Sequence, residues 1–143
     1  MAIEPDEVEA HFELRHQVFV QEQGIFPETD RDEHDENGIL LIACRRGRVV
    51  GAVRCYPVTM SVWYGGRLAV HPDYRKYDIG VRLVRKAVET VMNDPGVKHF
   101  LATVQIQNVR FFKRLGWISI DQPFLMKGRR HQLMEKPLNR CSQ

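Results

Sequence analysis

The sequence predicts a mixed α/β fold, a mostly antiparallel sheet flanked by helices, in a single domain over residues 1–143. Three observations predict it: an amphipathic helix near the start, short apolar segments with strand-like spacing, and a long amphipathic helix between two of those segments. A chain of 143 residues can bury about 70% of its unfolded surface, so it needs no disulfide or metal to fold.

The first helix is expected over Glu7–Gln21, because its apolar residues fall on one arc at 100° per residue. Arg15 and Glu22 fall on the same arc, where charged side chains are rarely buried without a partner. They indicate either a structural ion pair or the polar lining of a cleft. Gly24 and Pro27 end the helix.

Three strands are expected next. Ile39–Arg45 and Arg48–Tyr56 form a hairpin around Arg46-Gly47, and Gly66–Val70 ends at the turn-forming pair His71-Pro72. These segments are short, apolar and bounded by turn residues, which is typical of antiparallel strands.

In the second half of the chain, we expect a helix and a buried strand to complete a strand–helix–strand unit with the third strand. A short helix and two closing strands follow. Ile79–Met92 has the spacing of an amphipathic helix, and His99–Val104 reads as a buried strand. A short helix from Asn108 to Leu115 follows. Trp117–Ile120 and Gln132–Lys136 are expected to be strands with a loop between them.

Composition excludes several classes of protein. Lys and Arg exceed Asp and Glu by 21 to 18, a net charge of +3, which is too small to demand a nucleic-acid partner. The longest apolar run, Ile39–Cys44, is too short to cross a bilayer, and the first ten residues lack the apolar core of a signal peptide. Cys44, Cys55 and Cys141 form no CxxC pair and read as reduced thiols, so a cytoplasmic protein is expected.

An acidic segment, Pro27–Asn37, carries six carboxylates and one arginine. A solvated loop is the default expectation, and the functional alternative is that the loop attracts a cationic amine. No metal is expected, because the sixth position of the best EF-hand alignment is Asp35 instead of glycine.

The turn before the long helix, His71–Arg82, carries the strongest chemical signal. The first N–H groups of a helix have no partner within the helix, so they form an anion site, and Arg75 and Lys76 add positive charge. The segment matches neither a Walker loop nor a dinucleotide fingerprint.

Two motifs resemble those of the GNAT superfamily of N-acetyltransferases, which use acetyl-CoA. Arg75-Lys76-Tyr77-Asp78-Ile79-Gly80 is similar to the pyrophosphate loop [RQ]xxGx[GA]. Asn108 together with Phe111–Trp117 is similar to the second signature, an asparagine followed by FYxxxGF. The spacing between the two blocks also fits.

The resemblance extends over nearly the whole chain. The segment from Arg15 to Gln23 resembles the R..VFV.EQ segment of ElaA-like acetyltransferases, part of which acyl-homoserine-lactone synthases share. Gly66–Val70 and Gly128…His131…Met134 resemble two further ElaA-like blocks. A small group of nitrogen-starvation N-acetyltransferases is the expected subgroup.

The resemblance implies a splayed sheet and acetyl transfer from acetyl-CoA, as co-substrate, to the amine of a small, cationic acceptor by direct attack. Backbone N–H groups at the start of the long helix would hold the pyrophosphate, and the edge of the third strand would orient the acetyl carbonyl. The implied cofactor-binding residues are Leu68, Ala69, Val70, Arg75, Lys76, Tyr77, Asp78, Ile79, Gly80, Val81, Asn108 and Phe112.

Two residues depart from the family pattern. Asp78 replaces a glycine, and a carboxylate about 4 Å from a phosphate charge would cost roughly 1 to 4 kcal/mol of affinity. We expect Asp78 to cap the helix and face solvent instead. Phe112 replaces the tyrosine that protonates the departing thiolate, so another group substitutes, the enzyme is slower, or it is not catalytic.

The general base is expected to be Glu22, with His131 as second candidate and the acidic loop as a further source (Asp30, Asp32, Glu33, His34 and Asp35). Two alternatives to acetyl transfer stay open: a weak or inactive acetyl-CoA-binding regulatory module, and an acyltransferase that uses a longer acyl donor. The exposed edges of an open sheet also favour a homodimer.

Overall fold

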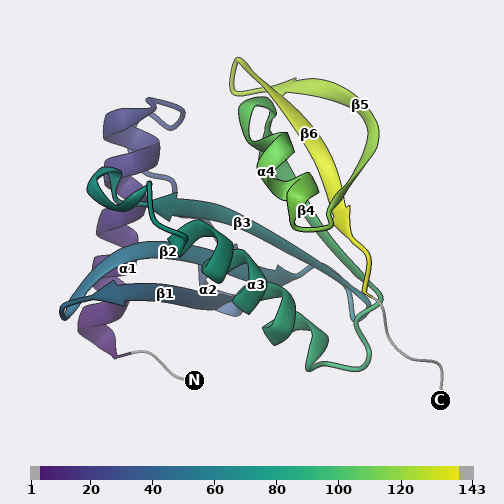
Figure 1. Cartoon of the computed structure of the whole chain (residues 1–143), viewed down its shortest axis with the longest axis horizontal. Helices are drawn as coiled ribbons and strands as arrows, with labels where there is room; N and C mark the ends of the chain where they lie inside the picture. Colours follow the sequence, from purple (N-terminus) through teal and green to yellow (C-terminus); the bar gives the residue numbers. More distant parts are fainter. Residues whose placement is uncertain (1–3, 139–143) are drawn as a thin grey trace.

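The structure is a computed structural model that describes residues 4–138; Cys141 lies outside them. Its elements, labelled in Figure 1, are α1 (Pro5–Arg15), η1 (His16–Glu22), α2 (His34–Asn37), β1 (Ile39–Arg45), β2 (Arg48–Pro57), β3 (Val62–Val70), η2 (Pro72–Tyr74), α3 (Ile79–Met92), β4 (His99–Gln105), η3 (Ile106–Asn108), α4 (Val109–Arg114), β5 (Ile118–Met126) and β6 (Arg129–Lys136).

The six strands form one mixed sheet in the order β1-β2-β3-β4-β6-β5. Neighbouring strands are antiparallel except β3 and β4, which run parallel. The mostly antiparallel α/β fold expected from the sequence is therefore confirmed. Pairing of a second copy along the edge strand β1 or β5 stays a prediction.

The sheet opens between its two parallel strands. The paired register joins Val62–Gly65 to His99–Ala102, whereas β3 runs on to Val70 and β4 to Gln105. A bulge lies where they separate: across β2, Ala52 pairs with Ala69 and Arg54 with Gly66. Arg67, at the bulge, has a φ of +54°. Such bulges bend a strand away from its neighbour.

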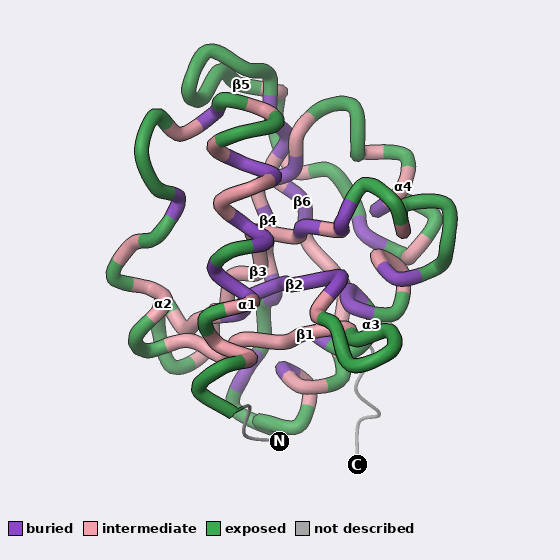
Figure 2. The backbone as a smooth tube through the Cα atoms, turned by 90° about the vertical axis from the view of Figure 1, so that its left-hand side faces the viewer, coloured by how far each residue is buried: buried purple, intermediate pink, exposed green. Residues whose placement is uncertain are grey.

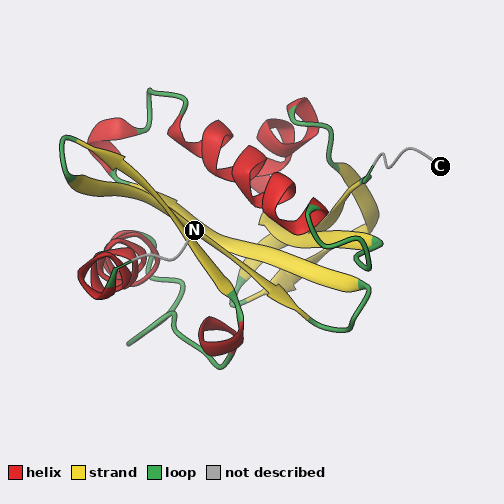
Figure 3. Cartoon of the chain, turned by 90° about the horizontal axis from the view of Figure 1, so that it is seen from below, coloured by secondary structure: helices red, strands yellow, loops and turns green. Residues whose placement is uncertain are grey.

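Helices cover both faces of the sheet, with α1 and η1 on one side and α3 and α4 on the other (Figure 3). β2 runs buried between these layers (Figure 2). Gly51 lets α3 lie close to β2, because a Cβ there would come within 2.7 Å of Leu83 Cδ1. This close packing sets the position of the start of α3.

The local predictions succeed where the spacing signal is strong. The helix Ile79–Met92 and the strand Ile39–Arg45 have the expected bounds, and the hairpin turn has φ values of 53° at Arg46 and 75° at Gly47. Positive φ at both positions is the conformation of a two-residue hairpin.

Two predicted boundaries are wrong. β3 begins at Val62 instead of Gly66, because the pair Gly65-Gly66 hides a strand that carries Trp63 and Tyr64. The loop expected between Ile120 and Gln132 is mostly the hairpin β5–β6, which turns at Lys127-Gly128 with φ of 55° and 73°. β5 is an edge strand with few buried residues, so it lacks the apolar alternation that marks a strand.

The first helix also changes geometry. From His16 onward it is a π-helix, in which Gln23 N–H bonds the carbonyl oxygen of Val18 at 2.9 Å. The wider turn advances each side chain by a smaller angle. Arg15 and Glu22 therefore do not share one face: Arg15 is 0% exposed, and the Glu22 side chain is 38% exposed.

The acidic segment is solvated only in part: Glu28, Glu33 and Glu36 are exposed, whereas the side chains of Asp30 and Asp35 are buried. Arg15 donates from Nε to Asp30 Oδ2 and from Nη1 to Asp35 Oδ1, each at 2.6 Å. Asp32 forms a two-bond pair with Arg54 at 2.5 and 3.0 Å. Arg15, Asp30 and Asp35 are almost fully buried. This cluster, the buried ion network, fastens the loop to the sheet face beneath α1. The arginines that pair with these aspartates lie outside the acidic segment. A count of charges within the segment therefore does not show that three of its carboxylates are paired.

The network makes stability dependent on pH. Burial first, and then the charge of Arg15, lowers the pKa of His11 to about 4. A histidine whose pKa is lowered on folding stabilises the fold fully above its unfolded pKa of about 6.5, and this contribution is lost as the pH falls toward 4. We expect urea denaturation to show a loss of about 3 kcal/mol over that window.

The control for this prediction is a pair of variants. His11→Gln should remove most of the pH dependence, whereas His16→Gln, one turn further along and only half-buried, should retain it. A wild-type unfolding free energy that stays constant from pH 7 to pH 4.5 would contradict the prediction.

Candidate active site

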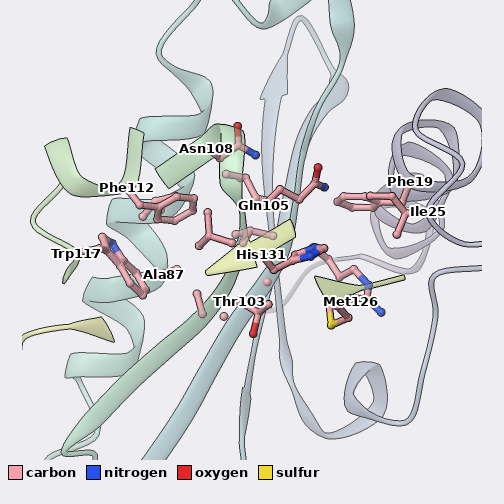
Figure 4. Close-up of a pocket in the computed structure, with 18 of the residues that line it drawn as sticks. Phe19, Ile25, Ala87, Thr103, Gln105, Asn108, Phe112, Trp117, Met126 and His131 are labelled. Atoms are coloured by element: carbon pink, nitrogen blue, oxygen red, sulfur yellow. The ribbon is translucent and has the colours of Figure 1, made fainter. Parts of the chain in front are cut away.

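A cavity of about 130 Å³ passes through the sheet where β3 and β4 separate. Phe19, Ile25 and Phe26 line it on the α1 side, and Phe112 and Trp117 line it on the α3 and α4 side (Figure 4). Among the predicted site residues, Leu68, Asn108, Phe112 and His131 line this one cavity. Residues from three separate parts of the chain are thus brought together.

The start of α3 offers unpaired backbone donors. The first bond of the helix runs from Arg82 N–H to the carbonyl oxygen of Asp78 at 3.0 Å. The N–H groups of Ile79, Gly80 and Val81 therefore have no acceptor within the helix. A Cβ at Gly80 would lie 3.4 Å from Phe111 Cζ, so this turn packs close to α4 and the second motif.

Asp78 occupies the N-cap position of α3, but the prediction that its side chain caps the helix is wrong. Its side chain makes no capping hydrogen bond. Instead Oδ2 accepts from Arg82 Nε at 3.1 Å, and the side chain is 64% exposed. Facing solvent was expected and is observed. Because Arg82 partly neutralises the carboxylate, its repulsion of a nearby phosphate is smaller than the sequence alone suggests.

The guanidinium group of Arg75 is hydrogen-bonded to other groups of the protein. Its two Nη atoms donate to the two carboxylate oxygens of Glu22, each at 2.6 Å, and Nε donates to the carbonyl oxygen of Val70 at 2.9 Å. Hydrogen bonding from Arg75 lowers the pKa of Glu22. A carboxylate with a lowered pKa and both oxygens engaged is a weak proton acceptor, which speaks against Glu22 as the general base.

Gln23, the residue after Glu22, accepts two hydrogen bonds from other elements. Gln105 Nε2 donates to Gln23 Oε1 at 2.9 Å, and Arg129 Nη2 donates to the backbone oxygen of Gln23. Glu22 and Gln23 thus connect η1 with the turn before α3, the end of β4 and the β5–β6 hairpin. We call this pair the clasp. The sequence motif EQ marks both residues, but their partners could not be inferred from spacing.

His131 lies in β6, is 3% exposed and lines the cavity. Its Nδ1 is 2.9 Å from the carbonyl oxygen of Arg129. Because a carbonyl can only accept, this contact assigns the proton to Nδ1 and leaves Nε2 with a free lone pair. His131 therefore has the tautomer of a general base.

Phe112 is buried against Trp117, with ring centroids 5.5 Å apart, and it brings no hydroxyl to the cavity. Tyr74, Tyr77 and His71 are not among the residues that line it. Tyr77 is instead 46% exposed, with the Arg45 guanidinium 4.8 Å from its ring centroid. No acid in the described cavity wall replaces the missing tyrosine.

The remaining predicted cofactor residues lie around the turn. Ala69 is buried beneath η1, next to Leu14 and Val18, while Lys76 is exposed. Within residues 4–138, no cluster of three or more His, Cys, Asp or Glu side chains could hold a metal ion. The described helices include none that is long and apolar enough to span a membrane.

Comparisons with known proteins agree with this architecture. The uncharacterized N-acetyltransferase YjcF of Bacillus subtilis is 30% identical over 128 residues, covering 87% of this chain and 89% of that protein. Escherichia coli ElaA is similar in structure, with a TM-score of 0.84 at 22% identity over 94% of this chain and 92% of that one.

Two further similar structures hold ligands. An aminoglycoside 6'-N-acetyltransferase complexed with coenzyme A has a TM-score of 0.78 at 17% identity, over 97% of this chain and 95% of that one. The CoA-dependent acyl-homoserine lactone synthase BjaI, solved with isopentyl-CoA, has a TM-score of 0.77 at 23% identity, over 94% of this chain and 77% of that one.

A sheet that opens between two parallel strands, with a histidine in the wall of the cavity there, is consistent with an acyltransferase. The model of the acetyltransferase (GNAT) family matches residues 3–117. The chain belongs to this family, as its two motifs predicted.

Proposed function

We propose that the protein transfers an acyl group from acetyl-CoA, or from a closely related thioester, to the amine of a small molecule by direct attack. One observation carries the proposal: the cavity lies between β3 and β4 with residues from both faces of the sheet in its wall, including Val84 on α3 and His131 on β6. Donor and acceptor can therefore meet from opposite sides.

The donor would be held by groups that suit a diphosphate and an extended arm. The N–H groups of Ile79–Val81 offer donors for the pyrophosphate. Asn108, Phe112 and Leu68 line the cavity, and Leu68 lies on β3 beyond its last pairing with β4. A backbone N–H on this part of β3 would stabilise the oxyanion that forms during attack. The coenzyme A complex of the similar aminoglycoside acetyltransferase supports this assignment.

His131 is the proposed general base in preference to Glu22. An aliphatic amine with a pKa of about 10.4 is mostly protonated at neutral pH, so a proton acceptor is needed. His131 lines the cavity, and in its neutral form the Nδ1 contact with the Arg129 carbonyl leaves Nε2 as the proton acceptor. Because Phe112 cannot donate a proton, CoA leaves as a thiolate, a group whose pKa is about 8.5 in free cysteine.

The acceptor's charge stays a prediction. Three of the six carboxylates of the acidic segment are paired with arginines: Asp30 and Asp35 with Arg15, and Asp32 with Arg54. Glu28, Glu33 and Glu36 are exposed, so some negative charge remains at the surface of the loop. The pairing weakens the argument for a cationic acceptor over a neutral amine. A panel of cationic, neutral and acidic amines would decide between them.

The proposal is tested by measuring CoA thiol release from acyl-CoA with and without an amine panel. Amine-dependent release supports an enzyme. Binding of acyl-CoA without any release supports the alternative of a regulatory binding module, for which Phe112 is the main argument. Absence of binding would remove both.

The variant Glu22→Gln distinguishes a structural role of Glu22, as the partner of Arg75, from a role as general base. Glu22→Gln removes the ion pair with Arg75 but leaves an amide of the same shape. We expect kcat to fall less than about fivefold while KM for the acyl donor rises, because an exposed pair contributes at most about 1 kcal/mol. If Glu22 were the base, kcat would fall about 10²- to 10⁴-fold. Steady-state kinetics separates these outcomes, and Lys86→Gln, an exposed charge on α3, is the control.

A further inference from the structure

Beyond the gap in the sheet, the cavity continues into a chamber on the α3 side. Six residues line this part, which we call the deep chamber: Val84, Ala87, Phe100, Ala102, Phe112 and Trp117. All are buried, with exposed fractions of 9% or less. Figure 4 shows Ala87, Phe112 and Trp117 across the cavity from Phe19 and Ile25.

The chemistry of the deep chamber suits a hydrocarbon. The one polar side-chain atom of the six residues is Trp117 Nε1, which is buried and has no hydrogen-bond partner within residues 4–138. An indole N–H is a donor only, so it cannot pair with an ammonium group. A protonated amine acceptor would therefore leave its charged group unsatisfied there, which is costly.

Small residues keep the chamber open. Ala102 pairs with Gly65 at the last position of the β3–β4 register. A Cβ at Gly65 would lie 2.9 Å from Phe100 Cζ, so the glycine leaves room for that ring. Ala87 is the small residue that α3 contributes to the chamber. Larger side chains at these positions would fill the space.

We propose that the deep chamber binds the acyl chain of the donor, and that the protein prefers a thioester of about four to six carbons to acetyl-CoA. This rests on the proposed function, which puts the thioester at the gap. The whole cavity, of which the deep chamber is one part, has a volume of about 130 Å³. This is the size of a space that holds a short hydrocarbon, since an apolar cavity of roughly 150 Å³ holds benzene.

The transfer step balances without a further reactant. The amine nitrogen bonds to the acyl carbon as the carbon–sulfur bond breaks, and the amine proton passes to His131 Nε2. CoA leaves as a thiolate and takes a proton from solvent.

The first experiment compares acetyl-, butanoyl- and hexanoyl-CoA with the same amine. Each buried methylene contributes a factor of about four, so we expect kcat/KM to rise about tenfold or more from acetyl to butanoyl. Equal or better use of acetyl-CoA would overturn this inference and leave the proposed function standing. Failure of every donor to bind would overturn both.

Two variants test where the chain binds. Ala87→Leu and Ala102→Val fill the deep chamber and should reduce the ratio of kcat/KM for butanoyl-CoA to kcat/KM for acetyl-CoA about tenfold. Ala43→Val, a half-buried alanine on β1 outside the cavity, is the matched control. Thermal melts confirm that each variant folds. An unchanged preference in both folded variants would contradict the proposal.

Fluorescence adds a readout that does not need turnover. The chain has two tryptophans, and Trp63→Phe leaves Trp117 alone in the chamber wall. Butanoyl-CoA should change the Trp117 emission more than acetyl-CoA does, with a lower Kd by about tenfold. Equal responses to CoA, acetyl-CoA and butanoyl-CoA would argue against occupation of the chamber.

Discussion

Replacing Arg15 by methionine is expected to destabilise the protein by about 3 kcal/mol, because two buried carboxylates lose their 2.6 Å partner. Asp30 keeps the longer ion pair with Arg67, at 3.3 Å, and Asp35 keeps the ion pair with Arg54, at 3.1 Å. Asp30 and Asp35, which are 1% and 6% exposed, each accept a 2.6 Å hydrogen bond from Arg15. A loss of this size is a large part of the stability of an ordinary domain. Urea denaturation at pH 7 measures it.

Arg31→Met is the matched control on the same loop. The Arg31 side chain is 48% exposed and lies 3.9 Å from its nearest carboxylate, that of Glu9. Its removal should cost less than about 1 kcal/mol. If Arg15→Met fails to fold, Arg15→Lys retains the charge but not the planar fork, and should give an intermediate loss. Equal effects of Arg15→Met and Arg31→Met would contradict the importance of the buried ion network.

Replacing His131 by asparagine is expected to lower kcat about 10²- to 10⁴-fold at neutral pH, the usual contribution of a general base. Binding of the acyl donor should change little, because the donor-binding groups at the start of α3 are untouched. Steady-state kinetics with a saturating amine gives kcat, and equilibrium titration with acyl-CoA gives Kd.

The pH dependence distinguishes a base from a structural histidine. As the pH approaches the amine pKa of about 10.4, more of the acceptor is already neutral and needs no base. The ratio of wild-type to variant kcat should therefore shrink with rising pH. A constant ratio, or a loss of folding in His131→Asn, would favour a packing role for this buried side chain.

The local elements could largely be predicted from the sequence. α3 has its expected bounds because its signals are local. Its apolar residues have helical spacing, and Asp94-Pro95-Gly96 follows directly and ends the helix. The start of α3 could be identified as an anion site for the same reason: free N–H groups at a helix start follow from the helix alone.

The candidate site could be predicted only in part. Asn108, Phe112 and His131 were identified by motif, yet their meeting in one cavity depends on the separation of β3 from β4. That separation accompanies a bulge at Arg67. The preceding pair Gly65-Gly66 is a signal for a bulge, but from the sequence we expect a strand that starts at Gly66. Thr103 and Gln105, which also line the cavity, were missed because they read as ordinary strand residues.

The sequence by itself determined the helices, the hairpin, the family motifs and the pattern of apolar faces, since each depends on residues a few positions apart. Only the tertiary structure decided which charges are paired. Glu22 is bound by Arg75, 53 residues away, and Arg15 by Asp35, 20 residues away. Electrostatic partners are chosen by proximity in space, and neither spacing nor composition encodes that proximity directly. The tertiary contacts therefore make a candidate base into a structural clasp and an acidic loop into a buried network.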